Sequence, residues 1–427
     1  MRRLSCLVLA VVCGWAGTAG AEQNSQPAGS PPAQNPSQGA PVWPGSTPAA
    51  NQTPKEETQP QVRLPAQSQA PAPAAPNGAA VPAPAAVQPE PSAQPAAPAD
   101  VDDGRVHLNV VVTDKQGNVI RGLTERNFTL LDNRKPRKIE SFEALAGADS
   151  HGDPVQVILA IDAVNISFDR VAMSRQYISQ FLRRDNGRLA HPVSIIWVTD
   201  IGLQQPLGPS MDGNALAAQL DGTAGQLRLM NRSAGDWGQI ERFDMSAQML
   251  DQLVSAMGRF PGRKLLIWIG PGWPMLDNPE MLTSGKQQKE LFQNMVDLTT
   301  KIRKAQIEIC SVAEGMPNFY TYLFESYLKG VKNPGQMNLP NMTLKVMAIW
   351  SGGQVRMPTN DMASEIARCM KDADAYYRIS FMPPRADGPN EYHELQMKVD
   401  KPGLTARTSN MYYNQPPTQE AGTATGH

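Results

Sequence analysis

The chain has 427 residues, a formal net charge of -1, 41% hydrophobic residues and 19% charged residues. A nearly neutral chain gives no electrostatic reason to bind nucleic acid or an anionic membrane, so neither is predicted as a partner.

The first residues show the pattern of a secretory signal peptide. Arg2 and Arg3 precede an apolar run that ends in three small residues, of which Ala21 is the last. The run is too short to span a bilayer comfortably. We therefore predict a signal peptide over residues 1–21 and a periplasmic or secreted protein without a membrane-spanning segment after cleavage. An uncleaved membrane anchor is the alternative.

Residues 22–100 are rich in Pro, Ala, Gln and Ser, with Trp43 as their only aromatic residue. Such a segment buries too little apolar surface to offset its chain entropy, and its prolines keep it extended. We predict a disordered linker, which serves either as a tether that holds the folded part off a membrane or wall, or as a plain spacer. Residues 415–427 are predicted to be a disordered tail.

Residues 101–152 have the period of two that is typical of strands. Val106, Leu108, Val110 and Val112 alternate with polar or outward positions and share one face. Residues 114–118 form a predicted turn with a glycine available for positive φ. The segment is predicted to be an N-terminal β module.

Residues 153–374 alternate between apolar strands and helices. Residues 155–162 form a nearly continuous apolar strand of the kind that is buried on both faces of a parallel sheet, and residues 169–184 follow at helical spacing. Further strands are predicted at 192–200, 264–270 and 307–313. The alternation predicts an α/β domain with a doubly wound, mainly parallel sheet.

Residues 375–414 return to the period of strands, with a turn at 385–390. Each β-rich flank has too few strands for a core of its own. We therefore expect the C-terminal strands to join the N-terminal β module.

The order of these motifs resembles the bacterial, acidobacterial-type von Willebrand factor A-related proteins. The resemblance covers residues 106–413 and rests on "VVVTDKQGNVIRGLTERNFTLLDN", "LAIDAVN", "SGGQV", "YYRISFMPP" and "LTARTSNMYY". It implies a von Willebrand A-like domain, export from the cytoplasm, and a role in adhesion or protein–protein binding.

The resemblance also directs attention to a metal-ion-dependent adhesion site, which uses Asp-x-Ser-x-Ser after the first strand. Asp162 matches the first position, but Val164 and Ile166 occupy the two serine positions and cannot ligate. Asn165 and Ser167 carry oxygens one residue out of register.

The remaining ligands of such a site are also missing or unplaced. Gly270 stands where a later aspartate is expected, and Thr199 and Ser233 are candidates for a threonine ligand by position only. Because Mg²⁺ needs about six oxygens in a tight octahedron, we predict no cofactor and no functional metal site. Asp162 is a weak ligand candidate and is interpreted as a carboxylate that caps nearby backbone amides.

No known catalytic motif is present. The histidines form no zinc-binding pair, and the chain has no P-loop and no Gly-x-Ser-x-Gly elbow. "NRKPR" is interpreted as a solvated basic loop. After signal cleavage two cysteines remain, Cys310 and Cys369, either as one disulfide or as two buried thiols.

We therefore expect a non-enzymatic protein that binds a protein partner or an envelope component through the carboxyl ends of its strands. A secreted hydrolase with an unrecognised site at this rim and an envelope spacer are the alternatives. Trp273 is the residue to test first, either as an exposed interface anchor or as a side chain packed under its own loop. The candidate rim residues are Asp162, Asn165, Ser167, Asp200, Gly270, Trp273 and Pro274.

Overall fold

The structure is a computed structural model that describes residues 103–146, 155–223, 235–273, 284–314 and 322–416. The predicted signal peptide, the predicted linker and nearly all of the predicted tail lie outside these residues. Among the described residues, no helix is both long enough and apolar enough to cross a membrane.

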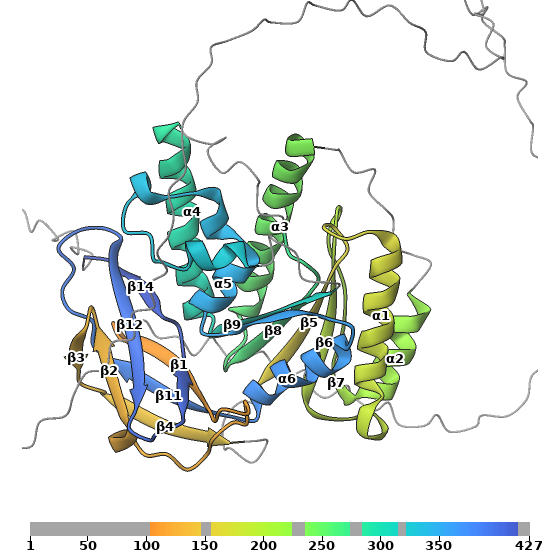
Figure 1. The fold of residues 1–427 in the computed structure, drawn as a ribbon, viewed down its shortest axis with the longest axis horizontal. Coiled ribbons are helices and arrows are strands. Elements are labelled where there is room, and N and C mark those ends of the chain that lie inside the picture. Colours follow the sequence, from red (N-terminus) through yellow and green to blue (C-terminus); the bar gives the residue numbers. More distant parts are fainter. Residues whose placement is uncertain (1–102, 147–154, 224–234, 274–283, 315–321, 417–427) are drawn as a thin grey trace, which may run out of the picture. The chain divides into compact units, whose positions relative to one another are not determined.

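The described residues form fourteen strands and six α-helices (Figure 1). The strands are β1 Val106–Thr113, β2 Phe128–Asp132, β3 Lys135–Arg137, β4 Ser141–Ala146, β5 Gln156–Asp162, β6 Arg188–Thr199, β7 Gly202–Asp212, β8 Lys264–Ile269, β9 Ile307–Glu314, β10 Gln354–Thr359, β11 Ala375–Phe381, β12 Glu391–Val399, β13 Thr405–Arg407 and β14 Met411–Asn414. The helices are α1 Phe168–Leu182, α2 Gly213–Gly222, α3 Gly235–Met257, α4 Gly285–Lys304, α5 Leu344–Trp350 and α6 Met362–Met370.

The largest sheet has six strands in the order β10-β9-β8-β5-β6-β7. Its inner strands are nearly continuous apolar runs because helices pack on both of its faces. On one face, Ile158 and Trp268 pack with residues of α3, α4 and α5. On the other face, Leu159 and Ile267 pack with residues of α1, α2 and α6.

The two β-rich flanks of the chain form two further sheets, in the orders β13-β1-β11-β4 and β14-β12-β2-β3. Each sheet contains strands from both flanks, since β1 pairs with β11 and β2 pairs with β12. A shared apolar cluster joins the two sheets, and the four residues predicted to share one face of β1 all belong to it: Val106, Leu108, Val110 and Val112.

The predicted fold class, a doubly wound and mainly parallel von Willebrand A-like sheet with one small β module, is wrong. The molecule has mixed α/β content in three sheets, and seven of the eleven strand pairings among the described residues are antiparallel. The six-stranded sheet is itself mixed because β7 runs antiparallel to β6. The expected joining of the C-terminal strands with the N-terminal ones does occur, as two antiparallel sheets with a shared apolar cluster.

The sequence missed β7 because its residues do not have a strand pattern. Gly202–Asp212 contains two glycines and two prolines, which are typical of loops. The segment is a strand because it pairs with β6, and the pairing shifts register where the ladder is irregular. Tertiary pairing overrides local propensity here.

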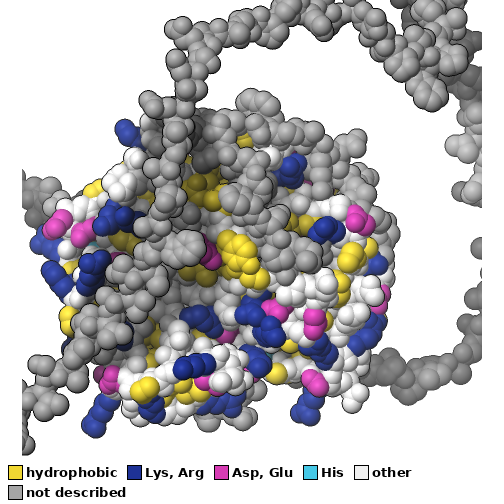
Figure 2. Space-filling model, viewed as in Figure 1, with side chains coloured by type: hydrophobic (Ala, Val, Ile, Leu, Met, Phe, Trp, Pro, Cys, Tyr) yellow, Lys and Arg dark blue, Asp and Glu magenta, His cyan; other side chains and the backbone are white. Residues whose placement is uncertain are grey.

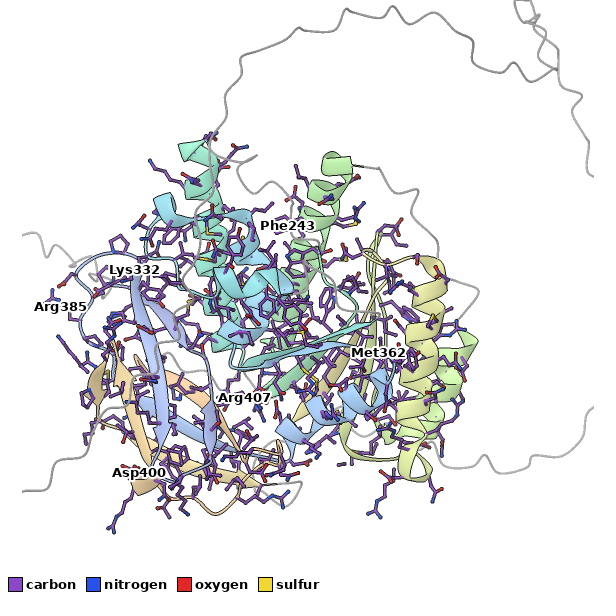
Figure 3. All side chains as sticks on the ribbon, in the orientation of Figure 1. Phe243, Lys332, Met362, Arg385, Asp400 and Arg407 are labelled. Atoms are coloured by element: carbon purple, nitrogen blue, oxygen red, sulfur yellow. A yellow bond between two sulfur atoms is a disulfide. The ribbon has the colours of Figure 1, made fainter. Side chains whose placement is uncertain are left out.

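A buried ionic network connects β13 to the six-stranded sheet. Arg407 donates to Asp372 at 2.7 Å and lies 3.7 Å from Glu308 (Arg407 is labelled in Figure 3). Arg263 donates to Glu308 and to the backbone carbonyl of Asp372. Burial raises the pKa of Glu308 to about 7, the positive charge of Arg263 opposes this rise, and the negative charge of Asp372 adds to it.

Cys310 of β9 and Cys369 of α6 form a disulfide, with their Cα atoms 6.2 Å apart. Both residues are fully buried. The bridge attaches α6 to the six-stranded sheet and resolves the alternative that the sequence left open.

Candidate functional site

The Asp162 carboxylate, at the end of β5, is saturated by donors from the protein. Its Oδ1 accepts hydrogen bonds from the backbone amides of Val164 at 3.0 Å and Asn165 at 2.9 Å. Its Oδ2 accepts from the Asn165 amide group at 3.0 Å and from the Trp268 indole at 3.1 Å. The interpretation of Asp162 as a capping carboxylate is confirmed.

Asp162 is completely buried, and this burial raises its pKa. The hydrogen bonds from Asn165 and Trp268 favour the charged form and oppose the rise. A carboxylate in this setting fixes the loop after β5 and offers no free lone pair to a ligand.

The two residues in the serine positions pack into the interior instead of facing a ligand. Val164 is 1% exposed and belongs to the apolar cluster around α3–α5, whereas Ile166 belongs to the cluster around α1, α2 and α6. The loop is therefore held by apolar packing on both faces of the sheet.

Gly270 prevents a carboxylate at the expected later position. Its φ is +136°, and a Cβ placed there would lie 2.7 Å from the Cβ of Asp162. An aspartate at this position would collide with Asp162, so the glycine allows the close approach of the two strand ends.

Trp273 is buried, with 3% of its surface exposed. Its indole donates to the Met342 carbonyl at 2.7 Å, and its ring packs edge-on against Trp268 at 5.7 Å. The hypothesis of an exposed anchor is wrong, because Trp273 packs beneath the segment around Met342.

Of the other candidate rim residues, three lie at this edge of the sheet and one lies outside the described residues. Asn165, Ser167 and Asp200 are half-buried at this edge of the sheet. Thr199, a positional candidate for a metal ligand, donates its hydroxyl to the Gly202 carbonyl at 2.8 Å and stabilises the β6–β7 turn. Pro274 and Ser233 lie outside the described residues. The described residues contain no group of three His, Cys, Asp or Glu side chains placed to hold a metal.

A polar groove of about 770 Å³ lies at the start of β12, away from this rim. Its lining carries both signs of charge: two basic residues, Arg134 and Lys332, and three acidic residues, Asp387, Glu391 and Glu394. Figure 3 shows Lys332 near this end of β12 and Asp400 beyond its other end. On the face that Figure 2 presents, basic and acidic side chains are interspersed over the surface.

Two hydrogen bonds between Asn133 and Glu394 hold one wall of the groove. The Asn133 amide donates to the Glu394 carbonyl at 2.8 Å, and the Asn133 side chain accepts from the Glu394 amide at 3.0 Å. Asn133 and Arg134 both have positive φ, at 50° and 65°. The β2–β3 turn is thereby held against β12.

A buried polar cluster supports this wall from behind. Asp132 contacts the His393 ring nitrogen at 2.7 Å, accepts from the Tyr412 hydroxyl at 3.1 Å and accepts from Arg137 at 3.2 Å. Burial tends to raise the pKa of Asp132, but His393, Tyr412 and Arg137 outweigh it and the pKa is lowered. The contacts of Asp132 with three side chains thus hold the groove wall in place.

No local sequence pattern identifies the groove, although two of its parts carry patterns of their own. "NRKPR" has the pattern of a solvated basic loop and residues 385–390 that of a turn, and the structure places residues of both at the same opening. They are separated by about 250 residues, so no local pattern shows that they meet.

Comparisons with known proteins identify no family. No protein-family model and no curated protein matches the chain. Among solved structures, the pilus adhesin SpaC from Lactobacillus rhamnosus GG matches with a TM-score of 0.30 and 10% identity, over 69% of this chain and 43% of the adhesin. The chain thus spans less than half of that protein, and a TM-score this low carries no argument about fold or function. The resemblance to bacterial von Willebrand factor A-related proteins stays a prediction.

Proposed function

We propose that the chain is an exported, non-enzymatic protein that binds another protein or an envelope component, and that the polar groove at the start of β12 is part of its contact surface. The observation that carries the proposal is the groove itself, a wide opening lined by charges of both signs. Mixed charges suit a polar macromolecular partner, because complementary charges set orientation and association rate.

The walls of the groove support the same proposal. The hydrogen bonds between Asn133 and Glu394, and the buried Asp132–His393 contact behind them, hold the wall in place before a partner arrives. A preorganised surface loses less entropy on binding than a mobile one.

The hydrogen bonds of Asp162 argue against this residue as the catalytic group of a hydrolase at the predicted rim. A hydrolase at this edge needs a titratable group that is free to act on a substrate. The Asp162 carboxylate is instead engaged by backbone and side-chain donors. The predicted signal peptide supplies export, and we propose no cofactor.

The test is to capture partners from the cell envelope of the source organism with the full-length protein. The variant reverses the two groove cations, Arg134→Glu with Lys332→Glu. The matched control reverses two exposed cations outside the groove lining, Arg126→Glu with Lys401→Glu. Thermal melting checks that both variants fold.

We expect the wild type and the control to retain the same captured partner, and the groove variant to retain at least tenfold less. Equal retention by all three proteins would remove the groove from the proposal. Release of fragments from the envelope by the wild type, without stable capture, would favour the hydrolase.

A further inference from the structure

The edge strands of the three sheets differ in how well they are protected from pairing with a strand of another molecule. An edge strand presents unpaired backbone groups, and proteins usually blunt such edges with short strands, prolines or irregular registers. Among the described residues, β3 and β13 have three residues each, and β14 has four. β7 contains Pro209 and shifts register, and β10 shifts register between Arg356 and Thr359.

Strand β4 is the edge without these devices. It pairs with β11 in regular register along its whole length, from Ser141 to Ala146, and contains no Pro, Lys or Arg. No described strand pairs with its other side. Its surface is open, since four of its six residues are exposed: Ser141, Glu143, Ala144 and Ala146.

One face of β4 extends the apolar cluster between the two antiparallel sheets. Phe142 lies 5.4 Å from Phe128 and 5.7 Å from Tyr377, measured between ring centroids. Ala144 and Ala146 follow on the same face by strand alternation. Their exposed side chains leave room beside this cluster for apolar groups of an added strand.

The opposite face of β4 carries Ser141, Glu143 and Leu145; Leu145 is buried in the core, so Glu143 makes the exposed part of this face acidic. The Glu143 carboxylate accepts a hydrogen bond from Arg378 of β11 at 3.1 Å, and the Glu143 side chain remains 54% exposed. A cation on a strand next to β4 would be a direct cross-strand neighbour of this carboxylate.

We propose that the β4 edge binds an extended segment of a partner protein, which adds as a further strand and alternates apolar with basic side chains. The apolar side chains lie beside Phe142, Ala144 and Ala146, and a Lys or Arg lies beside Glu143. Backbone hydrogen bonds to β4 supply affinity and the alternating side chains supply specificity. The proposal rests on the proposed function as a protein-binding chain and specifies the chemistry of the partner.

Two other occupants fit the edge less well. The β4 strand of a second copy brings Glu143 and no cation, so it does not complement the acidic face. Residues 22–100 of the chain are rich in proline, which lacks the N–H group that a strand ladder needs.

The test uses the full-length protein and fluorescently labelled, end-blocked hexapeptides in anisotropy titrations. One peptide alternates Val and Lys, a second alternates Val and Glu, and a third is the Val/Lys peptide with an N-methyl group on every residue, so that neither of its edges can donate to a strand ladder. We expect the Val/Lys peptide to bind, and N-methylation to weaken binding at least tenfold because it blocks strand addition while keeping the charge.

The variant Glu143→Lys tests the acidic face. We expect it to weaken binding of the Val/Lys peptide by roughly two- to fivefold, as for an exposed charge pair, and to improve binding of the Val/Glu peptide. The groove variant with Arg134→Glu and Lys332→Glu serves as the control and should bind the Val/Lys peptide like the wild type. Loss of envelope capture in this control, with peptide binding intact, separates the groove from the edge.

Three results would overturn the proposal. The N-methylated peptide could bind as well as its parent, or Glu143→Lys could leave the preference between the two charged peptides unchanged. Hydrogen exchange could also show every β4 amide protected in the free protein, which would mean that the edge is already occupied by the chain or by a second copy.

Discussion

Replacing Glu308 with Gln should remove a pH dependence of stability that the buried ionic network creates. Burial raises the pKa of Glu308 from its ordinary value of 4.5 to about 7, with Arg263 opposing the rise and Asp372 adding to it. The folded state therefore holds a proton that the unfolded chain releases. This contribution is fully present below pH 4.5 and is lost as the pH rises through 7.

The magnitude follows from the size of the pKa rise. Each pKa unit is worth about 1.4 kcal/mol, so a rise from 4.5 to about 7 corresponds to about 3 kcal/mol. Glu308 is 5% exposed, so solvent screens this effect little. Most of it, about 2 kcal/mol or more, should be lost between pH 5 and pH 8.

Urea unfolding of the full-length protein at pH 5 and pH 8 measures this loss. The free energy of unfolding of Glu308→Gln should fall by about 2 kcal/mol less over this interval than that of the wild type. The control is Glu290→Gln, which replaces a carboxylate on α4 that is 63% exposed, and it should follow the wild type. If Glu308→Gln and the wild type lose the same stability between the two pH values, the network does not hold the proton and the reasoning fails.

Three further predictions concern the end of β5, the disulfide and metal ions. Gly270→Ala should lower the free energy of unfolding by about 1–3 kcal/mol, because the added Cβ meets Asp162 and the backbone φ is positive. The control Gly388→Ala should leave the free energy of unfolding unchanged, since no atom lies within 4 Å of the added Cβ. Equal urea midpoints for the two variants would contradict this prediction. The disulfide closes a loop with a sequence separation of 59, so a reductant should lower the free energy of unfolding of the wild type by about 2–5 kcal/mol. The double variant Cys310→Ser, Cys369→Ser should be unaffected by the reductant. An equal loss of stability in both proteins would show that the disulfide is not its cause. Calorimetric titration with Mg²⁺, Mn²⁺ or Ca²⁺ should show no micromolar binding; binding abolished by Asp162→Ala would show that the loop after β5 rebuilds a metal site.

The sequence by itself determined features that depend on residues near one another in the chain. The alternation from Val106 to Val112 predicted the buried face of β1, because strand geometry places every second side chain on one face. The short distance from Asp162 to Asn165 similarly allowed the capping of backbone amides to be predicted, since both partners lie in one loop.

Only the tertiary structure decided features that depend on residues far apart. Gly202–Asp212 is a strand because β6 offers it a ladder, against its own propensity, and this pairing makes the largest sheet mixed. The two flanks form two antiparallel sheets because β1 pairs with β11 and β13 whereas β2 pairs with β12 and β3, and one apolar cluster lies between the sheets.

The candidate surfaces likewise arise from long-range contacts. Trp273 is buried because it packs against Trp268 and Met342, and Met342 lies about 70 residues away and accepts its hydrogen bond. No local signal distinguishes this from an exposed side chain. The groove combines Arg134, Lys332 and Glu391 from three distant segments. Packing free energy depends on which surfaces meet in space, so a sequence pattern that reports only neighbouring residues cannot assign these positions.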